Sequence, residues 1–184
     1  MSIPSFTRYP GPTRQTPPHA RLLAAIGVLV MLGACTSMQD IPAGTPLSEV
    51  QARYGAPTVE CPLADGNRRL IWSTQPMGQY AWSTQVSPDG TVGPVEQILT
   101  DANFSQVEAG SWGRDELHCT FGPPAETTIV GLPGSREVVW SYRYRQAGAW
   151  NSLMHFYFSN DTGKVDRKHP GPDPLYEPPE WNIF

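Results

Sequence analysis

The pattern of apolar and polar positions divides the chain into a leader and a structured part. An unbroken apolar run of eleven residues, 22–32, follows a segment that carries Arg8, Arg14 and Arg21 and no acidic residue. Beyond residue 43, apolar residues recur at helical spacing and then at alternate positions. That order is typical of short amphipathic helices followed by half-buried strands.

The first helix is expected over residues 46–54. Thr45 is suited to cap its N-terminus, and Pro46 suits the first helical position, where a missing N–H costs nothing. Gly55 suits the left-handed conformation that often follows a helix, and the proline that comes next but one prevents continuation. The sequence therefore predicts a helix of about nine residues.

The same features recur later in the chain at a nearly constant distance. The offset is 66 residues from Gly44 to Gly110, 67 from Gly55 to Gly122 and from Pro57 to Pro124, and 68 from Trp72 to Trp140. This regularity predicts a tandem repeat. A further helix is expected over 100–108, capped by Thr100. The matching segment 38–43 contains Pro42, so its helix should be shortened or lost.

Each helix is followed by segments with strand periodicity. They lie at 69–74, 81–86 and 92–99 in the first repeat, and at 138–145, 152–159 and 164–168 in the second. The glycine-rich segment 131–135 follows a short strand and is expected to be a hairpin loop. We therefore predict an α+β fold of two units, each with short helices packed on a three- to four-stranded antiparallel sheet.

These signals give the layout of the chain. A leader occupies 1–34, a tether 35–43, the first unit 44–99, the second unit 100–168, and a proline-rich tail 169–184. Five prolines in the tail remove backbone donors and favour an extended segment. Its apolar residues are expected to dock on the protein's own surface, or else to bind a partner.

The apolar run of the leader is too short to span a bilayer, which takes about 20 residues. It has the form of a secretory signal and ends in Leu32-Gly33-Ala34-Cys35. These four residues resemble the bacterial lipobox. The resemblance implies that Cys35 is lipidated and becomes the mature N-terminus, and Thr36 implies sorting to the outer membrane. An ordinary secretion signal is the alternative.

The part of the chain from Cys35 onward is acidic. It holds 10 of the 13 basic residues and all 17 acidic residues, a net charge of 10 − 17 = −7. This charge argues against binding of nucleic acid or of anionic lipid. Apart from Cys35 there are two cysteines, Cys61 and Cys119. They can form one disulfide in an oxidising compartment, or remain buried and unpaired.

No local catalytic motif is present. Neither a Gly-x-Ser-x-Gly elbow nor a phosphate-binding loop occurs, and no ligands repeat at the spacing of a zinc site. His118 and Cys119 are neighbours on a predicted helix and so cannot face each other. The sequence thus favours a protein that is not an enzyme and that uses no cofactor, metal or small-molecule substrate.

Tyrosine, tryptophan and arginine on an open sheet face are frequent in protein interfaces. In the second unit, the less apolar strand face carries Arg143, Arg145, His155 and Tyr157. These four residues are the candidate binding face. The alternative is that they form an ordinary solvated surface.

The sequence resembles the BamE (SmpA/OmlA) family of outer-membrane lipoproteins at Gly44, Val50, the Tyr-Gly-x-Pro motif 54–57 and the strand residue Trp72. Two such units in tandem resemble the architecture of β-lactamase inhibitory protein. The resemblance implies a periplasm-facing outer-membrane lipoprotein that binds an envelope protein and supports envelope assembly or integrity. The alternatives are an inhibitor of an envelope hydrolase such as a β-lactamase and, more remotely, a cysteine-dependent enzyme.

Overall fold

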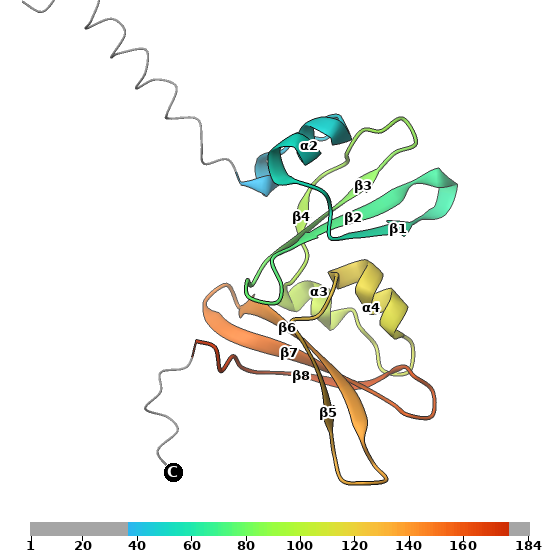
Figure 1. Cartoon of the computed structure of the whole chain (residues 1–184), viewed down its shortest axis with the longest axis vertical. Coiled ribbons are helices and arrows are strands. Elements are labelled where there is room, and N and C mark those ends of the chain that lie inside the picture. The colour runs from blue at the N-terminus through green and yellow to red at the C-terminus, as the bar shows by residue number, and fades with distance from the viewer. Residues whose placement is uncertain (1–36, 177–184) are drawn as a thin grey trace, which may run out of the picture. The chain divides into compact units, whose positions relative to one another are not determined.

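A computed structural model describes residues 37–176 of the 184-residue chain, and these belong to one compact unit (Figure 1). Cys35 and residues 177–184 lie outside the described part. The first repeat contains the elements η2 (Met38–Asp40), α2 (Leu47–Tyr54), β1 (Val59–Pro62), η3 (Ala64–Gly66), β2 (Arg68–Ser73), β3 (Ala81–Val86) and β4 (Glu96–Gln97). The second contains α3 (Asp101–Ser105), α4 (Arg114–Phe121), β5 (Glu126–Val130), β6 (Glu137–Gln146), β7 (Trp150–Phe158) and β8 (Val165–Pro172).

Both repeats form a four-stranded antiparallel sheet with its strands in chain order, β1-β2-β3-β4 and β5-β6-β7-β8. The register places Trp72 opposite Trp82 in the first sheet and Trp140 opposite Phe156 in the second. The repeated tryptophan therefore lies on the second strand of each sheet. This confirms the prediction of an α+β fold with two sheet units.

The helices agree with the predictions except at their ends. Helix α2 begins at Leu47, one residue later than expected, with Pro46 as its N-cap. The Thr45 hydroxyl donates instead to the Pro42 carbonyl, at 2.7 Å, so the predicted cap is wrong. In the second repeat, Thr100 caps α3 as predicted, because its side chain accepts from the Asn103 N–H. The matching helix of the first repeat is reduced to the three residues of η2.

Gly55 and Gly122 end the two equivalent helices with nearly equal φ angles of 80° and 81°, while their ψ angles are extended rather than left-handed helical. Only glycine adopts this region readily. A Cβ on Gly55 would meet nothing within 4 Å, whereas one on Gly122 would lie 3.3 Å from Cγ2 of Ile71.

We expect Gly55→Ala to lower the free energy of unfolding by about 1–3 kcal/mol through backbone strain alone. Gly122→Ala should cost more, because its methyl group also meets the first sheet. Urea unfolding of the two variants measures the difference. Equal losses would contradict the close packing of Gly122 on Ile71.

The apolar core extends across both repeats. A smaller cluster lies between α2 and one face of the first sheet, with Met38, Val50, Leu70 and Trp72 among its members. The larger cluster joins the other face of that sheet to α3, α4 and the second sheet. Its members include Val59, Ile71, Ile98, Phe104, Leu117, Phe121, Tyr142, Tyr144 and Phe156. The first sheet is therefore packed on both faces.

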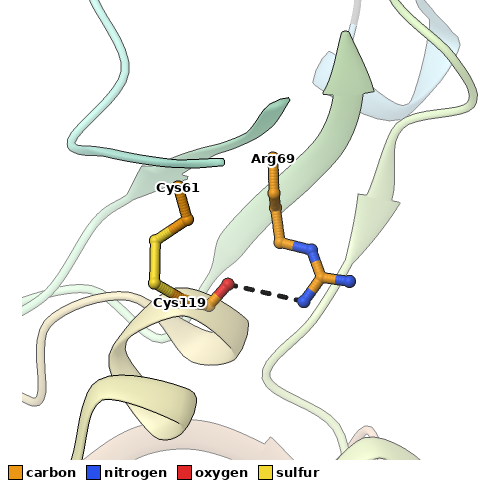
Figure 2. Close-up of a disulfide and its surroundings, with 3 residues drawn as sticks. All are labelled: Cys61, Arg69 and Cys119. Atoms are coloured by element: carbon orange, nitrogen blue, oxygen red, sulfur yellow. Dashed lines mark hydrogen bonds between the residues drawn. A yellow bond between two sulfur atoms is a disulfide. The ribbon is translucent and has the colours of Figure 1, made fainter. Parts of the chain in front are cut away.

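A disulfide between Cys61 on β1 and Cys119 on α4 links the two repeats, with Cα atoms 5.8 Å apart. Beside it, Nη1 of Arg69 lies 3.4 Å from the carbonyl oxygen of Cys119 and donates to it (Figure 2). The sequence left open whether these two cysteines form a disulfide or remain unpaired, and in the structure they form the disulfide.

The strand predictions need three corrections. Strand β1 was not predicted, because its four residues are too short for periodicity to be recognised, and the third predicted strand of the first unit is only Glu96–Gln97. The last strand continues to Pro172, four residues into the predicted tail. Pro170 and Pro172 are tolerated because β8 is an edge strand, where a missing N–H can face away from the sheet.

Candidate functional site on the outer face of the second sheet

The four predicted face residues lie on neighbouring central strands of the second sheet. Arg143 and Arg145 come from β6, while His155 and Tyr157 come from β7. The alternate residues of β6 and β7 face the core instead. Pairing with β8 adds His169 opposite His155 and Arg167 opposite Tyr157.

Arg143 does not belong to an exposed surface, and this part of the predicted binding face is wrong. Arg143 is 6% exposed. Its Nη2 lies 2.5 Å from a Glu126 carboxylate oxygen, and its Nη1 donates to the Pro76 carbonyl at 2.6 Å. Its Nε lies 2.9 Å from Oδ2 of Asp173, an ion pair whose atoms are not aligned as a hydrogen bond. Arg143 is therefore a structural residue.

The hairpin loop 74–80 of the first sheet, which includes Pro76, contacts this end of the second sheet. The Gln75 amide nitrogen donates to the Arg143 carbonyl at 2.7 Å, and the Arg143 N–H donates back to the Gln75 amide oxygen at 3.3 Å. The Asn151 side-chain oxygen accepts from both Gln79, at 2.9 Å, and Arg145, at 2.6 Å. Arg145 is half-buried and thus also engaged within the protein.

A partly accessible area of the face forms what we call the imidazole patch: the half-buried His155 and Tyr157 and the exposed Arg167 and His169. The His155 and His169 rings lie 5.3 Å apart, and Nε2 of His169 is 3.0 Å from the Tyr157 hydroxyl. The Arg167 guanidinium lies 4.0 Å above the Tyr157 ring and pairs with Glu137. His169 was missed because no periodic pattern indicated that β8 continues past residue 168. Arg167 lies within the predicted strand 164–168 but was not assigned to this face.

The geometry of the patch does not form a serine-histidine-carboxylate site. The Ser141 hydroxyl lies 2.8 Å from Nδ1 of His155, but Ser141 is only 2% exposed and so cannot reach a substrate. Glu126, the carboxylate next to Ser141 in the sheet, pairs with Arg143 and not with the imidazole. These residues therefore cannot form a catalytic triad, in which a carboxylate orients a histidine and the histidine activates a nucleophile.

Burial lowers the pKa of His155 below its ordinary value of 6.5, and the neighbouring His169 charge lowers it further, while Glu126 opposes the shift. As the pH falls below 6.5, His155 is protonated in the unfolded chain before it is protonated in the folded protein. The free energy of unfolding therefore decreases in that range.

We expect His169→Gln to move the titration midpoint of the His155 ring upward, towards 6.5, because the substitution removes the neighbouring charge. NMR titration of the imidazole resonances measures this midpoint. A midpoint that stays in place after the substitution would show that His169 does not act on His155.

Several kinds of chemistry find no support in the described residues. Both Cys61 and Cys119 are in the disulfide, so neither offers a free thiolate. Within residues 37–176, no three His, Cys, Asp or Glu side chains gather in a group suited to a metal ion. Every helix in the same range falls short of the length and hydropathy that a bilayer-spanning helix needs.

Strand β5, at the edge of the second sheet opposite to β8, adds a second surface. It is an edge strand, and Ile129 is 66% and Val130 37% exposed; Leu132, in the loop that follows, is 77% exposed. The other sheet edges carry features that hinder pairing: β1 ends in Pro62, β4 has two residues, and β8 contains Pro170 and Pro172. Strand β5 has neither proline nor lysine, so among the described edges it is the one suited to receive another strand.

The comparisons with known proteins give little further information. No family model matches the sequence, and no curated protein matches it. One matching solved structure is a cysteine-rich secretory protein from Staphylococcus aureus subsp. aureus Mu50, with 10% identity and a TM-score of 0.27; the match covers 72% of this chain and 45% of that one. The chain thus spans less than half of that protein, and so weak a likeness carries no argument.

Proposed function

We propose that this protein is an outer-membrane lipoprotein that faces the periplasm, is anchored through acyl chains on Cys35, and binds another envelope protein without catalysing a reaction. The anchor is supported by the sequence 32–35, which resembles the lipobox. It is also supported by the charge of −7 after the leader, which provides no electrostatic attraction to anionic lipid.

We also propose that both repeats are BamE-like and arranged in tandem as in β-lactamase inhibitory protein. Each repeat has an eight-residue helix that ends at a glycine with positive φ, followed by four antiparallel strands in chain order. The matching offsets in the sequence support a common origin of the two units.

The edge of β5 is the observation that favours protein binding most. An unpaired strand offers backbone donors and acceptors that an extended segment of a partner can pair with, and side chains beside it provide specificity. Ile129 and Leu132 supply exposed apolar contacts at this edge, and the imidazole patch lies on the same sheet. The partner is expected to place an extended segment along β5.

We expect Cys35→Ser to release the protein from the membrane fraction, because the remaining chain offers no other membrane attachment in this proposal. Immunoblots of membrane and soluble fractions measure the distribution. Thr162→Ser is the control, since it changes an exposed residue and leaves both Cys35 and the disulfide in place. A Cys35→Ser protein that stays in the membrane fraction would overturn the proposed anchor.

The binding surface is tested separately, by a photo-crosslinking amino acid at position 129 in intact cells. We expect crosslinks to an envelope protein from this position and none from Ala52, which is exposed on α2 of the first repeat. Crosslinks of equal yield from both positions, or from neither, would contradict binding at β5. An envelope hydrolase as the crosslinked protein would favour the inhibitor over the assembly function.

A further inference from the structure

The first repeat contains an aromatic pocket that the proposed function does not use. It has a volume of about 400 Å³ and is lined by Tyr54, Trp72 and Trp82, with Met38 and Thr74 among the other residues at its walls. Trp82 stacks on Tyr80, with ring centroids 5.8 Å apart. The pocket thus combines aromatic surfaces from α2, β2 and β3.

One polar atom in this pocket's walls has no partner. The indole N–H of Trp72 donates to the Gly55 carbonyl at 2.9 Å, whereas the indole N–H of Trp82 is buried and makes no hydrogen bond within the described residues. The side-chain oxygen of Gln97, opposite Trp82 in the sheet, is also buried without a partner. A buried donor left unpaired costs free energy, which an acceptor on an occupant of the pocket would recover.

The described chain ends close to this pocket. Asp173 is fixed by its ion pair with Arg143, and the Tyr176 hydroxyl donates to the Met77 carbonyl at 3.3 Å. Residue 176 is therefore held at the hairpin loop 74–80, and Thr74 at the base of that loop lines the pocket. The three residues that separate Met77 from Thr74 span at most about 11 Å. The eight residues beyond 176 reach about 25 Å as a polyproline helix.

The composition of residues 177–184 fits such a pocket. They are Glu-Pro-Pro-Glu-Trp-Asn-Ile-Phe. Aromatic-lined grooves bind proline-rich segments because the polyproline conformation is preformed and its carbonyls are free to accept hydrogen bonds. The charges are also complementary, because the exposed Arg53 guanidinium lies 5.5 Å from the Tyr54 ring centroid and the segment carries two glutamates.

We propose that the pocket of Tyr54, Trp72 and Trp82 is a binding site for a proline-rich peptide, and that residues 177–184 of the same chain occupy it. A carbonyl of this segment accepts the hydrogen bond from the Trp82 indole, and Glu177 or Glu180 faces Arg53. The site does not involve β5, and its lining includes Ser37, two residues after Cys35.

The test uses the full chain with a photo-crosslinking amino acid at Trp181, in both the lipidated protein and the Cys35→Ser form. We expect a crosslink of monomer mass whose peptide partner comes from residues 54–58 or 72–82. Trp82→Phe keeps an aromatic side chain, although a smaller one, and removes the N–H; it should lower the crosslink yield about fivefold. The matched control carries the crosslinking amino acid at exposed Leu132 and should give no crosslink to these segments.

Three outcomes would overturn the proposal. A product of dimer mass would mean that a second copy supplies the segment. A crosslink in the Cys35→Ser form that disappears in the lipidated protein would mean that acyl chains fill the pocket. Absence of any crosslink to residues 54–58 or 72–82 would mean that the segment lies elsewhere. Since none of these results depends on a partner at β5, failure here is distinguishable from failure of the proposed function.

Discussion

Replacing both Cys61 and Cys119 by alanine is expected to lower the free energy of unfolding by about 4 kcal/mol. The disulfide joins residues 58 positions apart, so it removes much of the freedom of the unfolded chain. Its loss should also weaken the contact between the repeats, because the bond links β1 of the first to α4 of the second. The effect is large compared with the net stability of most domains.

Urea unfolding of the double alanine variant measures this loss against the parent protein. Both proteins carry Cys35→Ser, which leaves no cysteine outside the bridge. A midpoint equal to that of the parent would mean that the bond does not constrain the unfolded chain. A transition that splits in two, in contrast, would assign separate stabilities to the repeats.

Arg143→Met is expected to cost about 3–5 kcal/mol at pH 7, because it leaves the Asp173 carboxylate buried without its cation. Asp173 is 1% exposed, and the same arginine also holds the Pro76 carbonyl and Glu126. The substitution therefore breaks a junction between the hairpin loop 74–80, strand β6 and the chain after β8. Few other single changes in the described residues should have so large an effect.

Urea unfolding again provides the measurement. Arg167→Met is the matched control, because it removes an arginine whose ion pair with Glu137 is on the surface, and it should change stability little. The double variant Arg143→Met/Asp173→Leu should recover much of the loss, since a buried pair can be replaced by apolar side chains. If Arg143→Met is as stable as Arg167→Met, the junction does not hold the repeats together.

Much of the fold could be predicted because its signals are local. The helix that ends at Gly55, the alternation of Val138, Trp140 and Tyr142, and the offset between the tryptophans each depend on a few neighbouring residues. These patterns were sufficient for the two units and most of their strands. Strand β1 escaped prediction because four residues show too little alternation.

The candidate site could not be predicted as well, because it depends on contacts between distant residues. Alternation placed Arg143 correctly on the outer face of its strand. Its burial, however, depends on Pro76 and Asp173, which lie 67 residues before it and 30 after it. Likewise, Lys168 donates to three carbonyls at the end of α3, more than 60 residues earlier. Sequence periodicity contains no information about such pairs.

The core that spans both repeats has a consequence for the order of folding during synthesis. A nascent chain that ends after β4 has Ile71, Ile98 and Leu99 in place but lacks Phe121 and Leu117, which cover them in the finished protein. The first repeat, although synthesised first, therefore completes its packing only after α4 has emerged. Until then its exposed apolar face can bind chaperones. Cys61 is also still a free thiol and can form a disulfide with a cysteine other than Cys119.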